Sequence, residues 1–266
     1  MNLPMLGVAG QAGSGKDTVA DYLVSTYGFT KVALADPLKR LAYKVFDFSE
    51  DQLWGPSSSR DAIDLRYEHK AFWDTARARL AKYGLDFVSD ALNLHHYCEA
   101  VVQALGSLAS WFSWLEESFR GKLSPRIVLQ TLGTEWGRGL NSTLWVDYLA
   151  RVVTQLGTRG VEYDKVRGLT STLDMWKMLR TEPPHIRGVV VSDLRFPNEL
   201  EQLRRAGGKV IRIVRPHTDG AAATLGIAGH ASEVQDAGEF DLLVVNDKDL
   251  AQLYNAIDIY LLTIEN

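Results

Sequence analysis

The chain has 266 residues, of which 46% are hydrophobic and 23% charged, as is ordinary for a globular protein. Its formal net charge of −4 is unlike the basic balance of proteins that wrap nucleic acid, so we expect no nucleic-acid partner. Cys98 is the only cysteine, which excludes a disulfide within the chain and argues against a cysteine-based zinc site.

The chain begins MNLPMLGVAGQAG, which turns into glycines after a few apolar residues and lacks the basic start of a signal peptide. No later segment approaches the ~18 uninterrupted apolar residues of a membrane span. We therefore expect a cytosolic protein with no membrane partner.

Short apolar, β-branched runs predict strands that are buried on both faces of a parallel sheet. There are five such runs, at residues 5–9, 29–35, 188–192, 209–214 and 240–245. Helical patterns follow them at 18–27, at 199–206 with Asn198 as its cap, and after Asp249, which can cap the last helix. This alternation of strands and helices predicts an α/β fold.

The middle of the chain has no convincing strand and many helical windows. The most regular windows are 71–94, 98–119, 125–136 and 144–156, whereas 55–61 and 157–168 have the composition of exposed loops. We predict a core made of residues 1–36 and 181–266, and a large helical insertion at 37–180.

The segment GQAGSGK matches the phosphate-binding pattern G-x-x-x-x-G-K between a predicted strand and a predicted helix. Glycines let backbone N–H groups curl around an anion, the helix N-terminus adds its dipole, and the lysine reaches the phosphates. The candidate residues are Gly10, Gly13, Ser14, Gly15 and Lys16.

Asp17 occupies the position where most such loops have a hydroxyl that binds Mg²⁺. A carboxylate is a hard oxygen ligand for Mg²⁺, although it is also a favourable charge at a helix start. Thr18 can supply the hydroxyl one place later. The G-K-x-T arrangement favours small-molecule kinases of the nucleoside monophosphate kinase type.

Two segments carry candidate groups for a second anion. Asp36, Lys39 and Arg40 follow the second strand, where ligands sit in open α/β sheets; helix capping is the alternative role for Asp36. Gln130, Thr134 and Arg138 are spaced by four, so an α-helix would place them on one face beside Glu135. Solvent exposure is the alternative for this face.

Three further groups follow the later strands. Asp193 is placed like an acid that holds Mg²⁺ through water, and Arg195 could bind phosphate through two hydrogen bonds. The alternative is that the two residues pair with each other and only stabilise the turn. Arg215 leads into a stretch of small residues that has the composition of a lid near 215–235, or of an ordinary surface loop. Asn246 is expected beside the base of a nucleotide, unless it forms a plain turn.

Taken in order, GKDT, ALADPLKR, LQTLGTEWGR, SDLRFPNE and GHASE followed by LLVVND resemble the bacteriophage deoxynucleoside monophosphate kinase family. The resemblance implies a three-layer P-loop kinase core with five parallel strands in the order 2-3-1-4-5, a helical acceptor-binding insertion and a lid. It also implies transfer of the ATP γ-phosphate, with Mg²⁺, to a deoxynucleoside monophosphate (dNMP). By this match Lys16, Arg138, Arg195 and Arg215 handle phosphate.

The same segments leave alternatives open. The candidates for shaping the base pocket are Trp136, Trp145, Gln130 and Glu135. They do not determine which base is accepted. A phosphomevalonate or dephospho-coenzyme A kinase, or a nucleotide-binding module without catalysis, is the rival interpretation. A homodimer is a reasonable expectation, and a phage-encoded enzyme would act in the host cytoplasm.

Overall fold

The computed structural model describes residues 3–11, 13–96, 98–157, 161–171, 186–216 and 240–264. Contacts divide the chain into two units, which are described separately. Among the described residues the first unit comprises those up to Leu34 and those from Leu149 onward, and the second comprises Ala35–Tyr148.

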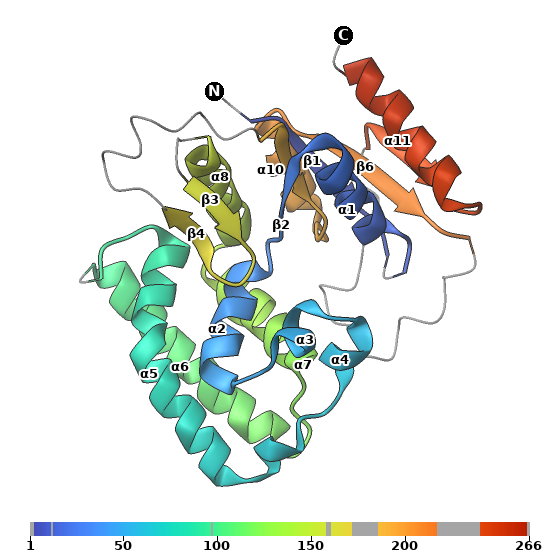
Figure 1. Ribbon diagram of the computed structural model, residues 1–266. Helices are drawn as coiled ribbons and strands as arrows, with labels where there is room; N and C mark the ends of the chain where they lie inside the picture. Colours follow the sequence, from blue (N-terminus) through green and yellow to red (C-terminus); the bar gives the residue numbers. More distant parts are fainter. Residues whose placement is uncertain are drawn as a thin grey trace. The chain divides into compact units, whose positions relative to one another are not determined.

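The first unit contains a parallel sheet of five strands in the order β2-β5-β1-β6-β7 (Figure 1). The strands are β1 (Met5–Ala9), β2 (Phe29–Val32), β5 (Gly188–Val191), β6 (Lys209–Val214) and β7 (Leu242–Val245). Counted along the chain as the five strands of this sheet, the order is 2-3-1-4-5, as the family resemblance implies.

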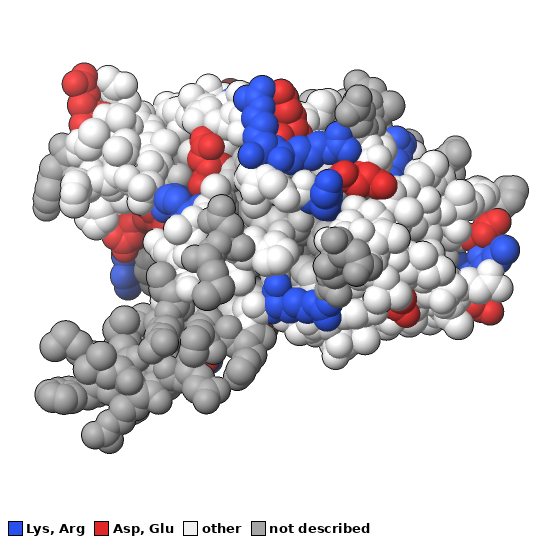
Figure 2. All heavy atoms as spheres, turned by 90° about the horizontal axis from the view of Figure 1, so that it is seen from above, with Lys and Arg blue, Asp and Glu red and all other residues white. Residues whose placement is uncertain are grey.

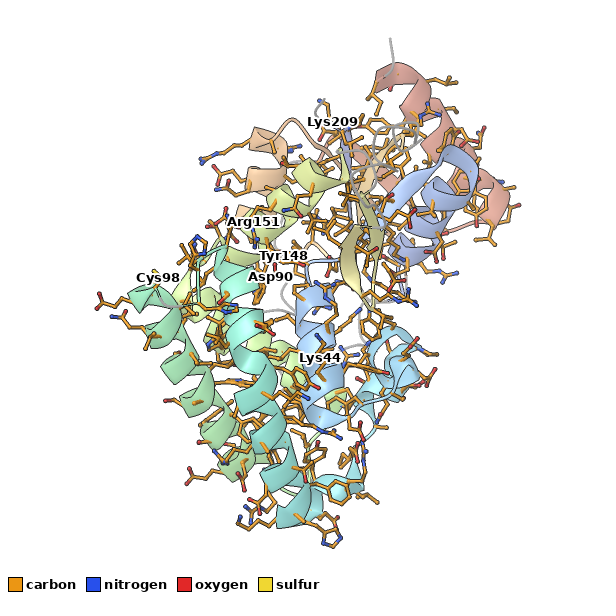
Figure 3. All side chains as sticks on the ribbon, turned by 60° about the vertical axis from the view of Figure 1, so that its left-hand side comes forward. Lys44, Asp90, Cys98, Tyr148, Arg151 and Lys209 are labelled. Carbon is orange, nitrogen blue, oxygen red and sulfur yellow. The ribbon has the colours of Figure 1, made fainter. Side chains whose placement is uncertain are left out.

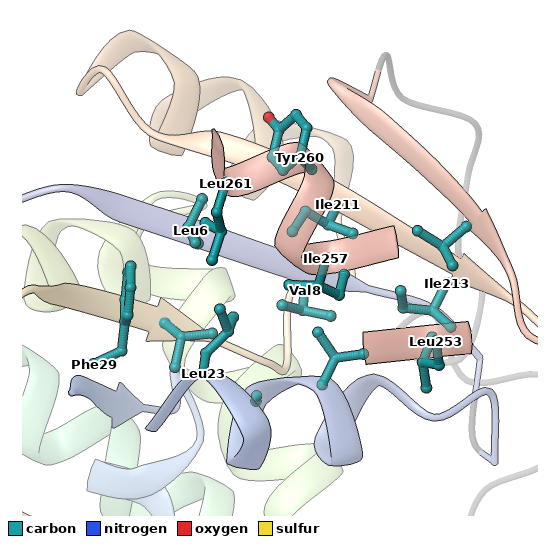
Figure 4. Close-up of a cluster of buried hydrophobic side chains, with 14 residues drawn as sticks. Leu6, Val8, Leu23, Phe29, Ile211, Ile213, Leu253, Ile257, Tyr260 and Leu261 are labelled. Atoms are coloured by element: carbon teal, nitrogen blue, oxygen red, sulfur yellow. The ribbon is translucent and has the colours of Figure 1, made fainter. Parts of the chain in front are cut away.

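Helices cover both faces of this sheet. The helices α1 (Lys16–Tyr27) and α11 (Leu250–Ile264) bury Leu23 and Ile257 against Leu6 and Val8 of β1 (Figure 4). On the opposite face, a Cβ at Gly7 would lie 3.3 Å from Leu203 of α10 (Pro197–Arg205). Side chains alternate between the two faces of a strand, so the three-layer α/β arrangement is confirmed.

The second unit is helical. Its elements are α2 (Asp36–Phe46), α3 (Glu50–Trp54), α4 (Ser57–Asp61), η1 (Leu65–Glu68), α5 (Lys70–Leu92), α6 (Glu99–Phe119), α7 (Pro125–Thr131) and η2 (Leu132–Arg138); α8 (Leu144–Leu156) crosses the boundary. Aromatic rings form much of its core: Phe46 packs against Trp73 and Phe112, and Trp73 donates a 2.8 Å hydrogen bond to the Tyr67 carbonyl.

Two segments that we expected to be loops are regular structure. Residues 57–61 form α4. Residues 161–171 form an antiparallel hairpin of β3 (Val161–Asp164) and β4 (Gly168–Ser171); 158–160 lie outside the described residues. The Asp164 carboxylate accepts hydrogen bonds from the backbone N–H groups of Val166 and Arg167, which closes the turn. The expectation of no strand between residues 37 and 180 was therefore wrong.

The start of α10 also differs from the prediction. Asn198 is inside the helix, because Pro197 occupies its first turn. The Glu199 carboxylate accepts hydrogen bonds from the backbone N–H groups of Arg195 and Phe196, at 2.8 and 3.1 Å. A glutamate at the third helical position thus satisfies the helix start in place of Asn198. By contrast, Asp249 caps α11 as predicted, accepting from the Gln252 N–H at 2.9 Å.

Within the part of the chain that the structure describes, none of the helices combines the length and the hydropathy that a membrane crossing requires. Basic and acidic side chains lie next to one another on the face of the molecule drawn in Figure 2.

Candidate nucleotide site

The glycine-rich loop lies between the end of β1 and the first turn of α1. Gly15 adopts a positive φ of 102°, and a Cβ there would lie 2.5 Å from the Asn246 side-chain nitrogen. Only glycine combines that backbone conformation with so close a neighbour. The loop is further held by hydrogen bonds from the Ser14 N–H to the Gln11 carbonyl and from the Val19 N–H to the Gly15 carbonyl.

A cavity of about 800 Å³ opens over this loop within the first unit. It is lined by Gly13, Gly15, Lys16, Asp17 and Thr18, by Arg215 after β6, and by Asn246 and residues 248–251 after β7. The structure thus brings together the loop, one of the predicted arginines and Asn246, all at the carboxyl ends of parallel strands. That is where open α/β sheets bind ligands.

The loop fits a phosphate group by two independent features. The side chain of Lys16 is only 18% exposed and lies at the cavity. The Ser14 hydroxyl is buried, with no hydrogen-bond partner among the described residues, although such groups are nearly always paired. A polyanion at the N-terminus of α1 would meet the helix dipole, a cation and a spare hydroxyl.

Asp17 projects from the first turn of α1 and is 63% exposed. Its carboxylate lies 3.3 Å from the ammonium groups of both Lys16 and Lys31, and Lys31 also pairs with Asp21 at 2.9 Å. Partial burial acts to raise the pKa of Asp17, but the two lysines outweigh it and hold that pKa below its usual value. Asp17 is therefore charged at neutral pH, as a metal ligand must be.

Sequence reasoning missed Lys31. Its place in β2 put it with the buried run, and its pairing with Asp17, 14 residues away, depends on the packing of α1 on the sheet. Among the described residues no cluster of three or more acidic, histidine or cysteine side chains is present. A magnesium ion at Asp17 would thus keep water or phosphate ligands, as Mg²⁺ usually does.

Asp193 and Arg195 lie after β5 in the same unit. The Asp193 carboxylate accepts a 2.8 Å hydrogen bond from the Leu34 N–H, so it links the segment after β2 to the end of β5. The turn at Arg195 is held by Glu199 through backbone groups. Both side chains are half-buried. The predicted lid, beyond Arg215 and Pro216, lies outside the described residues.

The predicted acceptor residues belong to the second unit. Asp36 is 3% exposed and accepts a 3.2 Å hydrogen bond from the Trp54 indole, with the Lys39 ammonium 3.9 Å away. The cap position of α2 is occupied by Ala35, and Asp36 lies in the first turn of the helix, so the alternative that placed Asp36 at the cap was wrong. Arg40 donates a hydrogen bond to the Tyr148 hydroxyl (labelled in Figure 3).

The segment from Gln130 to Arg138 is not one α-helix. Gln130 is buried in α7, but residues 132–138 are π-helical, with Thr134 and Arg138 half-buried and Glu135 exposed. A π-helix has more residues per turn than an α-helix, so the angles between Gln130, Thr134 and Arg138 are not those of the predicted α-helical face. That these three side chains share one face stays a prediction.

Trp145 packs against the π-helical segment. It is 4% exposed, donates a 2.9 Å hydrogen bond to the Gly133 carbonyl, and its ring occupies the space that a Cβ at Gly137 would need. Trp136 is likewise buried, donating to the Ala104 carbonyl. Both tryptophans shape the segment from inside the core.

A phosphate loop that connects the central strand of a parallel sheet to a helix, beneath a cavity of nucleotide size, defines a P-loop α/β protein. Two relatives narrow the class. The chain is 26% identical over 259 residues to "Putative deoxynucleotide monophosphate kinase" of Acanthamoeba polyphaga mimivirus, covering 95% of this chain and 93% of the relative. It is 25% identical over 276 residues to "Deoxynucleotide monophosphate kinase" of Escherichia phage RB69, covering 96% and 98%.

No family model matches the chain. The similarity to these two proteins nevertheless extends over nearly the whole sequence, and it confirms the resemblance to the phage deoxynucleoside monophosphate kinases that the ordered motifs indicated.

Proposed function

We propose that this protein is a deoxynucleoside monophosphate kinase, which transfers the γ-phosphate of ATP to a dNMP and forms a dNDP and ADP. The observation that carries the proposal is the cavity over the phosphate loop, where Lys16, Arg215 and the N-terminus of α1 meet. The names of the two relatives support the same chemistry.

The donor nucleotide belongs to the first unit in this proposal. The loop N–H groups, the Ser14 hydroxyl and Lys16 bind the β- and γ-phosphates of ATP, as in other P-loop proteins. Asn246 and the start of α11 line the same cavity, and the proposal places the base beside them.

Asp17, Thr18 and Asp193 are the residues that would hold Mg²⁺, directly or through water. When bound, the ion neutralises charge on the phosphates and helps to align them. Asp17 is paired with Lys16 and Lys31, so both lysines are placed to orient the carboxylate.

The transfer itself needs no protein nucleophile. A phosphate oxygen of the dNMP, mostly dianionic at neutral pH because its second pKa is near ~6, forms a bond to the γ-phosphorus as the bond to the β–γ bridging oxygen breaks. The electron pair of that bond leaves with ADP. The repulsion between the two anions is offset by the positive charges of Lys16, Arg138, Arg195 and Arg215. One well-placed arginine can raise the rate of such a transfer roughly 10³-fold or more.

The acceptor is proposed to bind the insertion, residues 37–180, together with Asp36 at its edge. Lys39 and Arg40 supply charge, while Gln130, Thr134, Glu135 and Trp145 contact or shape the site. Residues 1–36 and 181–266 then form the donor part, with the lid near 215–235. If the gene is carried by a phage, the reaction takes place in the host cytoplasm.

A coupled assay of ADP release from ATP, run with each natural dNMP and NMP, tests the proposal. We expect turnover with at least one dNMP. Turnover with phosphomevalonate or dephospho-coenzyme A but with no dNMP would reject it in favour of another small-molecule kinase. Binding of ATP without transfer to any acceptor would favour the non-catalytic module.

A further inference from the structure

A buried ion pair in the second unit joins two helices far apart in the sequence. Asp61 is the last residue of α4, and Arg126 lies in the first turn of α7. The Arg126 Nε donates a hydrogen bond to the Asp61 Oδ1, and the two side chains are only 16% and 7% exposed. Taking both charges out of water is costly unless every polar atom is paired.

One atom of this pair is not paired. The Asp61 Oδ2 is buried and has no hydrogen-bond partner among the described residues. A nearby carboxylate shows the usual arrangement: Asp64, 8% exposed, receives hydrogen bonds from Arg66 on both of its oxygens, at 2.7 to 3.2 Å. The unit therefore satisfies one buried carboxylate and leaves the other with a free acceptor, which costs stability.

The pair lies with residues already assigned to the acceptor. Gln130 is one α-helical turn beyond Arg126 on α7, so both project from the same face, and Gln130 is 6% exposed. The continuation of α7 packs on α2, since a Cβ at Gly133 would lie 3.0 Å from Leu38. The helix α2 begins with Asp36, the other buried acid proposed for the acceptor.

An ionised carboxylate oxygen only accepts hydrogen bonds, so its missing partner is an N–H or O–H group. Every nucleobase carries an N–H group on its pairing edge. We propose that the Asp61 Oδ2 accepts a hydrogen bond from the N–H of the acceptor base, and that Arg126 is a positioning residue that orients Asp61 through its other oxygen. This inference rests on the proposed function and names a residue that binds the acceptor base.

Asp61→Asn tests the proposal with little change of shape. The asparagine oxygen still accepts from Arg126, but an NH₂ group replaces the Oδ2 and opposes the base N–H. We expect the KM for the best dNMP to rise about tenfold or more, as for loss of a hydrogen bond to a charged group. The KM for ATP should stay within about twofold. The matched control is Asp64→Asn, which weakens a comparable buried pair without removing a free acceptor, and should leave both KM values unchanged.

A second measurement distinguishes the base from the sugar. Removing the 3′ hydroxyl from the dNMP should raise the KM by the same factor in the wild-type protein and in Asp61→Asn, because that hydroxyl is not the partner of Asp61. If the KM rises only in the wild type, the Oδ2 binds the sugar hydroxyl and the proposal is overturned.

The proposal stays testable if Asp61→Asn does not fold. A dNMP in which methyl groups replace every hydrogen of the pairing-edge N–H groups should then show a raised KM with the wild-type protein, and an unchanged KM would overturn the inference. If the wild-type protein turns over no dNMP at all, the proposed function falls and this inference with it. If dNMPs are substrates but Asp61→Asn matches the wild type, this inference alone fails.

Discussion

The side-chain amide of Asn246 donates a 2.8 Å hydrogen bond to the carbonyl oxygen of Ser14, 232 residues earlier in the chain. The two residues are 7% and 1% exposed. The contact connects the end of β7 to the phosphate loop, so Asn246 holds the loop in shape as well as lining the cavity.

We expect Asn246→Ala to raise the KM for ATP about fivefold to tenfold, because a buried hydrogen bond of this kind is worth about 1 kcal/mol. The KM for the acceptor should change little. Asn255→Ala is the matched control, because Asn255 is exposed on α11. Equal KM values for ATP in Asn246→Ala and the wild type would show that the loop does not need this support.

Asp17→Ala should weaken magnesium-dependent turnover while leaving the fold intact. Asp21→Ala is the control: Asp21 also pairs with Lys31, at 2.9 Å, but does not line the cavity. Titration of ADP release with Mg²⁺ should show a raised half-saturating concentration for Asp17→Ala only. Identical curves for both variants would mean that Asp17 is only a favourable charge at the helix start.

Gly137→Ala should destabilise the second unit by about 1–3 kcal/mol, since the new methyl group would overlap the Trp145 ring. Gly139→Ala is the control, because a Cβ there meets nothing within 4 Å and its φ is −65°. That change should be neutral or stabilising by up to about 1 kcal/mol. Denaturant unfolding of both variants measures the difference, and equal stabilities would contradict the packing of Trp145 on this segment.

Stability should fall at alkaline pH through Tyr27. Its hydroxyl donates a 2.7 Å hydrogen bond to the Asp258 carboxylate, which raises the pKa of Tyr27 to about 12. The folded pKa lies above the unfolded value of about 10. The stabilisation is therefore complete below pH ~10 and is lost as the pH rises toward 12.

The direction of this pH dependence is checked by measuring the free energy of unfolding of Tyr27→Phe and of the wild type at pH 8 and pH 11. The variant should be less stable than the wild type by about 1 kcal/mol at pH 8, and the gap should narrow at pH 11. Tyr43→Phe serves as the control, because Tyr43 is 40% exposed. A gap that is the same at both pH values would exclude the proposed linkage.

The sequence predicted the sheet well because its strands are continuous apolar runs, which have few other stable placements. It predicted the loop for a similar reason: glycines, lysine and flanking elements are local in sequence. The hairpin at 161–171 was missed because β3 alternates half-buried and exposed residues and contains the acidic residues Glu162 and Asp164. Its turn depends on one side chain, Asp164.

The acceptor side was harder to predict because its geometry depends on tertiary contacts. Trp145 determines the path of the segment around Gly137, and no periodicity within that segment reveals the π-helix. Likewise Asp61 stands in a serine-rich stretch with the composition of a loop, and its pairing with Arg126, 65 residues later, appears only when α4 and α7 pack.

The most direct test of the central claim is ADP release from ATP and Mg²⁺ across the natural dNMPs, with wild-type protein and Lys16→Met side by side. The account predicts turnover by the wild type with at least one dNMP, with dNDP formed in equal amount, and none by Lys16→Met. Absence of dNDP with every dNMP, or equal turnover by the two proteins, would contradict it.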